Sequence, residues 1–400
     1  MIRNPKLLLL LLSPLTATAA EERVVFNRDV RPLIAEYCYH CHGPDPGSRK
    51  EGIRFDREEG FFGKREDSDP AVVKGHPEKS PLYMRITSTD SDEVMPPPKE
   101  HKTMKPQEIA VLKKWIEQGA EWQPHWAFIA PEKPAVPAGA AHPVDAFIRE
   151  RLAISGLKPS PQADKRTLAR RVSLDITGLP PAPEMVEAFV NDAAPDAYEK
   201  LVDKLIASPS YGEHRGRYWL DAARYGDTHG LHIDNYREIW PYRDWVINAF
   251  NRNQHFDEFT VEQIGGDLLP KPTREQLIAT GFHRCNITTA EGGTIPEENL
   301  ANYAKDRVET TSWVWLGLTS NCAVCHDHKF DPITQKDFYA MTAFFRNTTQ
   351  FHSDRNVRDT APVLVLPQGD DAKRARCDSC RDRCDQREAG GAPEGHRCGV

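Results

Sequence analysis

The sequence lacks any internal apolar run long enough to cross a bilayer, which excludes an internal transmembrane helix. It has no excess of positive charge. The 52 Lys and Arg residues stand against 59 Asp and Glu, a net charge of −7, which excludes a protein built to coat nucleic acid. The 32 prolines and 25 glycines argue against a coiled coil. The 39% of hydrophobic residues among 400 supplies enough apolar material for two or three domain cores.

The first 20 residues have the pattern of a secretory signal peptide. Arg3 and Lys6 precede an apolar stretch over 7–12, and small residues over 16–20 offer a cleavage site near Ala20. The stretch is too short for a stable membrane span, although an uncleaved anchor is the alternative. We therefore expect a periplasmic or otherwise exported protein, in a compartment where cysteines can be oxidised or modified.

Four of the nine cysteines form two copies of one motif. Cys38 and Cys41 are followed by His42, and Cys322 and Cys325 are followed by His326. Cys-x-x-Cys-His is the attachment signature of c-type haem. Two thiols three residues apart can form thioethers to one porphyrin, and the next residue can donate a nitrogen to its iron. The sequence thus predicts covalent haem c at the first motif and a second haem at the other.

A Cys-x-x-Cys pair has other uses, which remain open for both motifs. It can form a disulfide, half of a zinc site or a redox dithiol. The second motif is the less certain, because no clear sixth ligand follows it. The histidines that could serve there are His214, His229, His232 and His283. An open sixth position would instead make the second haem a candidate catalytic centre.

The surroundings of the first motif predict a small helical haem domain over 21–123. Apolar spacing predicts a helix over 28–37 with Asn27 as its N-cap, and a second helix opens at Pro106 and ends near Gly119. Between them, Met95 precedes three prolines, which would hold its sulfur in place as a sixth ligand. Weaker candidates for that role are Met84, Met104 and His76.

Residues 26–122 resemble the planctomycete-type cytochrome c domain. The resemblance rests on matching stretches at 26–32, 38–43, 75–80, 95–97 and 115–120. It implies a class I cytochrome c fold with His42 and Met95 as the axial positions. A Met95 ligand would also fill the coordination sphere of the iron, which argues for electron transfer rather than ligand activation at this site.

A proline-rich linker over 124–143 separates this domain from a second one over 144–352. Helical spacing returns from Val144, and strand-like alternation is scarce, so we expect a mostly helical domain and a mainly α fold for the whole chain. The second domain resembles the DUF1549 family in ordered stretches that include 219–225, 266–270 and 322–332. That resemblance implies an exported, cytochrome-associated protein and supplies no reaction.

Several polar side chains of the second domain allow two interpretations. Asp227, His229, His232 and Asp234 could ligate a metal or bind substrate, but His-x-x-His outside a helix fixes no geometry. A solvated loop is the favoured interpretation. His328 is expected to form hydrogen bonds, or to cap a site with Asp327 and Asp331, and Cys285 is expected to be a buried thiol.

Residues 353–400 are charged and poor in periodic apolar residues, so we expect most of this tail to be disordered. Its cysteines could form a zinc knot, with a truncated end as the alternative. They are Cys377, Cys380, Cys384 and Cys398. Members of this architecture usually continue into a further domain, DUF1553, which is missing here.

Two functions follow from these patterns. The preferred one is an exported dihaem c-type cytochrome that transfers electrons to or from a redox partner protein. The alternative is an exported metal-dependent enzyme, perhaps acting on polysaccharide, in which the first haem is an accessory and the second motif binds zinc or stabilises structure. A third interpretation, with a disulfide at each Cys-x-x-Cys, leaves His42, His326 and Met95 without a purpose.

Overall fold

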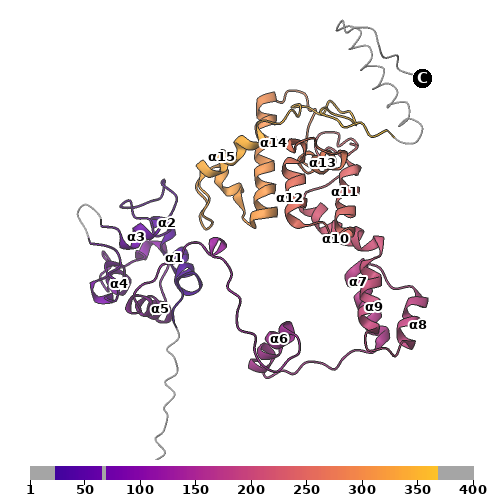
Figure 1. The fold of residues 1–400 in the computed structure, drawn as a ribbon. Coiled ribbons are helices and arrows are strands. Elements are labelled where there is room, and N and C mark those ends of the chain that lie inside the picture. Colours follow the sequence, from indigo (N-terminus) through magenta and orange to yellow (C-terminus); the bar gives the residue numbers. More distant parts are fainter. Residues whose placement is uncertain (1–22, 65–68, 368–400) are drawn as a thin grey trace, which may run out of the picture. The chain divides into compact units, whose positions relative to one another are not determined.

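A computed structural model describes residues 23–64 and 69–367. This part of the chain contains helices α1 to α15 and no β-strand, which confirms the mainly α fold (Figure 1). Residue contacts divide the chain into two compact units. Unit 1 comprises the described residues up to 135 together with 322–335, and unit 2 comprises 136–321 and the described residues from 336. The expected signal peptide lies outside the described residues.

Unit 1 is built from short helices joined by loops. Its α-helices are α1 (Arg31–Tyr37), α2 (Tyr39–His42), α3 (Glu58–Phe62), α4 (Pro81–Thr87) and α5 (Pro106–Glu117). A π-helix, η1 (Phe26–Val30), runs directly into α1. The 3₁₀ turns are η2 (Pro77–Lys79), η3 (Pro98–Glu100) and η4 (Trp126–Phe128). A further 3₁₀ turn, η8 (Ser320–Val324), leads into residues 322–335 of the same unit.

An aromatic core holds unit 1 together. The ring of Phe26 lies 4.3 Å from that of Trp122 and 5.8 Å from that of Phe61, and Trp115 packs against the same group. Helix α5 buries Leu112, Trp115 and Ile116, as its apolar spacing predicts. The predicted N-cap at Asn27 is wrong. The helical segment already begins at Phe26, and the Asn27 side chain instead accepts a hydrogen bond from Arg31.

Unit 2 contains the remaining helices. They are α6 (Pro143–Ile154), α7 (Lys165–Thr177), α8 (Pro183–Asn191), α9 (Ala197–Ile206), α10 (Pro209–Ala222), α11 (Trp240–Asn251), α12 (Phe256–Gly265), α13 (Arg274–Ala279), α14 (Pro296–Thr311) and α15 (Gln335–Phe345). Shorter helical turns are η5 (Gly266–Leu268), η6 (Thr280–Arg284) and η7 (Ser312–Leu316). Helix α7 ends at Gly178, whose positive φ of 71° suits a residue without a side chain.

Two hydrophobic clusters stabilise unit 2. Helices α7, α8 and α9 bury one cluster that includes Val172, Phe189 and Leu201. Helices α10 to α13 enclose the other, where the rings of Trp245 and Phe259 stack 5.2 Å apart. Gln263 is fully buried there and accepts hydrogen bonds from Trp219 and Tyr242, so its polar oxygen is satisfied inside the core.

The structure differs from the expected domain boundaries at two places. Residues 322–335, expected within the second domain, belong to unit 1. Residues 353–367, expected in a disordered tail, are described here, and Asp354 and Thr360 are buried within unit 2. Neither segment has helical periodicity. Residues 353–360 are held by hydrogen bonds to residues distant in sequence, such as that from Thr288 to Asp354. In 322–335, Asp331 lies 3.7 Å from the distant His125. The cysteines at 377–398 lie outside the described residues.

Candidate functional site

The first Cys-x-x-Cys-His motif lies where α1 passes into α2. The backbone N–H groups of Cys41 and His42 both donate to the carbonyl of Cys38, at 3.2 and 2.8 Å. This single turn brings both thiols and the imidazole together. The chain leaves the turn at Gly43, where a Cβ atom would lie 2.2 Å from the carbonyl oxygen of Tyr39. A glycine is therefore required directly after the motif.

Unit 1 shelters this motif partly from water. Cys38, Cys41 and His42 are each half-buried, and the His42 ring packs edge-on to Phe55 at 5.6 Å. Cys38 as a whole residue is half-buried, but its thiol is buried, which raises the pKa of the thiol to about 12. Backbone hydrogen bonds from Lys50 to Cys41 and from Phe55 to His42 fold the following loop back onto the motif.

Three methionines were candidates for an axial ligand in unit 1, and their surroundings differ. Met104 is buried in the hydrophobic core, where it fills space. Met84 is 55% exposed on α4. Met95 is half-buried in the loop before η3, and its backbone N–H donates to the carbonyl of Arg85. Of the three, Met95 alone is half-buried, and its backbone is held in place by this hydrogen bond.

The second motif forms a similar turn in a more exposed setting. The N–H of Cys325 donates to the carbonyl of Cys322 at 3.4 Å, and both cysteines and His326 are exposed. Nδ1 of His326 lies 2.8 Å from the carbonyl oxygen of Asp327, so it carries the ring proton and donates it. Nε2 is then the nitrogen with a lone pair, which is the arrangement of a metal-ligating histidine.

His328 forms hydrogen bonds, as the sequence predicts. Its Nδ1 accepts from the backbone N–H groups of Phe330 and Asp331, at 3.2 and 2.7 Å. The opposite nitrogen therefore carries the proton and faces the Asp331 carboxylate at 3.8 Å. His125 belongs to no motif of the sequence, yet its Nε2 lies 3.7 Å from the other oxygen of Asp331. No sequence spacing could relate two residues so far apart along the chain.

The four histidines proposed for the second haem all lie in unit 2. His229 uses both ring nitrogens in contacts with Thr288 and Val357. His283 donates from Nε2 to the carbonyl of Ile264, and burial lowers the pKa of its ring to about 4. His214 packs beside Tyr218, and desolvation lowers its pKa. His232 is exposed, with Nδ1 3.4 Å from Asn356.

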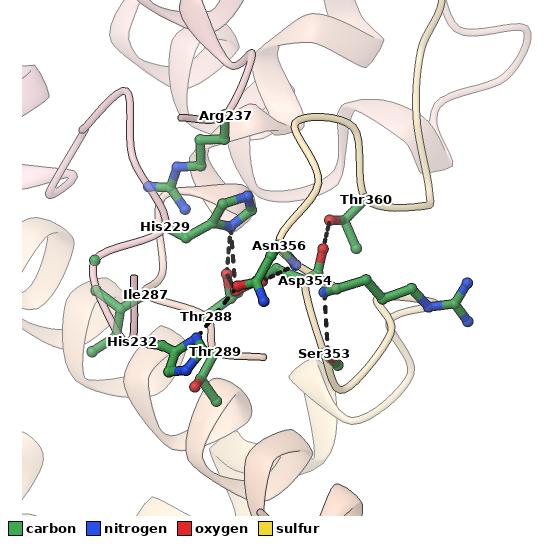
Figure 2. A network of polar contacts seen from close by, with 12 residues as sticks. His229, His232, Arg237, Ile287, Thr288, Thr289, Ser353, Asp354, Asn356 and Thr360 are labelled. Carbon is green, nitrogen blue, oxygen red and sulfur yellow. Dashed lines mark hydrogen bonds and ion pairs between the residues drawn. The ribbon is translucent and has the colours of Figure 1, made fainter. Parts of the chain in front are cut away.

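His229 lies at the centre of a polar network in unit 2 (Figure 2). Its Nδ1 is 2.6 Å from the Thr288 hydroxyl, which in turn donates to Asp354 at 3.1 Å. The Asp354 backbone is held by Thr289 and Thr360. His229 and Asp354 are 4% and 1% exposed in their side chains. The network therefore joins the 227–237 loop to the 353–360 segment and leaves neither ring nitrogen available to act on a substrate.

The predicted exposure to solvent is found for three of the four polar residues of this loop. Asp227, His232 and Asp234 are exposed, whereas His229 is buried. Asp234 accepts a hydrogen bond from the N–H of Gly230, which closes the loop on itself. Within the described ranges, no three His, Cys, Asp or Glu side chains are arranged to hold a metal ion. Cys285 is buried, as predicted, and burial raises the pKa of its thiol to about 12.

No helix among the described residues is long and apolar enough to cross a membrane.

No curated protein and no solved structure is significantly similar to this chain. Two family models do match, in the order that the sequence motifs suggest. The model for planctomycete cytochrome C matches residues 38–99, and the model described as protein of unknown function DUF1549 matches residues 143–350. The second match covers just over half of the chain, which therefore belongs to the DUF1549 family and carries a planctomycete cytochrome C domain before it.

Proposed function

We propose that the protein is an exported c-type cytochrome that binds two haems and transfers electrons to a redox partner protein. One observation carries the proposal: both Cys-x-x-Cys-His motifs fold into a turn in which the second cysteine N–H donates to the first cysteine carbonyl. Two thiols on one turn, followed by a histidine, are the donor set that c-type haem requires.

At each proposed site, the cysteines would attach the haem and other side chains would ligate its iron. Cys38 and Cys41 would form the two thioethers of the first haem, and His42 and Met95 would ligate its iron. Cys322, Cys325 and His326 would hold the second haem, with His326 oriented by its hydrogen bond to the Asp327 carbonyl. When bound, haem supplies one-electron chemistry by cycling its iron between the ferrous and ferric states.

The test is the number of covalent haems per chain. The mature protein is produced with a c-type maturation system, and the pyridine haemochrome spectrum is compared with the protein concentration. We expect two haems in the wild type and one in Cys322→Ala. Cys285→Ala is the matched control, because that thiol lies in a hydrophobic core and should leave the count at two. A wild-type count of one would contradict the proposal for the second motif.

A further inference from the structure

The second Cys-x-x-Cys-His motif belongs to unit 1, although its sequence neighbours on both sides belong to unit 2. Residues 322–335 form one compact body with the cytochrome domain, and the flanking residues 136–321 and 336–367 form the other. The two attachment motifs are therefore parts of the same unit.

A specific contact fixes the segment to unit 1. Nε2 of His125 lies 3.7 Å from Oδ1 of Asp331, and the two side chains are only 8% and 18% exposed. Nδ1 of His125 accepts a hydrogen bond from the N–H of Ala127, so the ring proton is on the nitrogen that faces the carboxylate. His328 directs its own ring proton at the other oxygen of Asp331. The carboxylate thus lies between two imidazole N–H groups, at distances of 3.7 and 3.8 Å.

His125 is itself attached to the core of the cytochrome unit. The side chain of Gln123, two residues before His125, accepts a hydrogen bond from the backbone N–H of Asn27, at 3.1 Å. Trp122 packs on Phe26 in the aromatic core. The position of Asp331, and with it the position of the second motif, is therefore determined by the same core that holds the first.

We propose that residues 322–335 carry the second attachment motif onto the cytochrome unit, so that both haems form one electronically coupled pair, with His125 and Asp331 as positioning residues. The inference rests on the two-haem function proposed above. Cys38, Cys41 and His42 would hold one haem of the pair, and Cys322, Cys325 and His326 would hold the other. One electron would pass between them, one iron being oxidised as the other is reduced, and a redox partner protein would supply or remove that electron.

The experiment measures circular dichroism in the Soret region, since two haems that are close together give a split signal of opposite signs. It uses the full-length holoprotein and two variants of one residue. His125→Asp places a second carboxylate against Asp331 and repels the segment. His125→Gln keeps an N–H donor at that position and is the matched control. Pyridine haemochrome counts accompany every spectrum, and far-ultraviolet circular dichroism checks the fold.

We expect two haems in all three proteins and a split Soret signal in the wild type and in His125→Gln. In His125→Asp the amplitude of the splitting should fall severalfold. Two haems without a split signal in the wild type would overturn the coupled pair and leave the two-haem function standing. A splitting that survives His125→Asp unchanged would overturn the positioning role. A wild-type count of one haem would instead contradict the function on which the inference rests.

Discussion

At the scale of single residues, burial controls the protonation of several side chains. The Cys38 and Cys285 thiols both have a pKa of about 12 because their surroundings disfavour the thiolate. One of them belongs to the first Cys-x-x-Cys-His motif and the other to the core of unit 2. The thiolate is the reactive form of cysteine, so both should be slow to react in the folded chain without haem.

Alkylation measures this effect directly. At pH 8 a thiol of pKa 12 is ionised about a thousandfold less than an ordinary cysteine of pKa about 8.5. We expect iodoacetamide to modify Cys38 and Cys285 in the folded, haem-free chain at least a hundredfold more slowly than in urea, as followed by peptide mass spectrometry. Equal rates in the two states would show that these thiols are not shielded. Exposed Cys322 serves as the internal comparison.

His283 should make the stability of unit 2 depend on pH. Burial lowers its pKa to about 4 in the folded protein, against about 6.5 in the unfolded chain. As the pH falls from 6.5 to 4, the unfolded chain gains a proton that the folded chain does not. Stability is therefore lost across that window, by at most about 3 kcal/mol.

Urea unfolding at pH 7 and pH 5 checks this expectation. The wild type should lose more stability between the two values than His283→Gln, whose amide can still donate to the carbonyl of Ile264. An identical loss in both proteins would assign the pH dependence to other groups.

At the scale of elements, the loop between α4 and α5 holds the candidate axial ligand, Met95. We expect oxidised protein to show a near-infrared charge-transfer band from sulfur to iron, and Met95→Ala to lose it while keeping its covalent haem. Removing the thioether should also lower the reduction potential of that haem. Met84→Ala, on the exposed side of α4, should keep the band. A wild type without the band would contradict ligation by Met95.

The elements also show what sequence patterns can reveal. Helices α5 and α11 match their apolar spacing, because burial of one face is what forms an amphipathic helix. On α9, Leu201 and Leu205 are buried, whereas Tyr198 and Ile206 of the same apolar face are exposed. The spacing over α6 predicts a shared face of Phe147, Ile148 and Leu152, but Phe147 and Ile148 are exposed and Leu152 is half-buried. The buried position of His229 and the pairing of His125 with Asp331 depend on partners distant in sequence, which no local pattern encodes.

At the scale of the whole molecule, removing residues 353–367 tests whether this segment stabilises unit 2. A chain that stops after residue 352 loses Asp354 and Val357, which hold Thr288 and His229. Buried polar groups left without partners cost about 1–3 kcal/mol each. We expect this truncation to lower the melting temperature of unit 2 relative to a chain that stops after residue 367.

Differential scanning calorimetry of the full chain and the two truncated chains makes the comparison. The haem absorbance at the first motif should be the same in all three, since Cys38, Cys41 and His42 lie in unit 1. Equal melting temperatures for the two truncated chains would show that residues 353–367 contribute nothing to unit 2.

The return of residues 322–335 to unit 1 has a consequence for biosynthesis. Residues 136–321 of unit 2 are synthesised between the two parts of unit 1, so the two cysteine motifs emerge from the ribosome at different times. Closing this long loop costs little free energy, because each doubling of loop length costs only about 0.6 kcal/mol of closure entropy. The effect is on timing instead, because unit 1 can be completed only by a late, non-local closure.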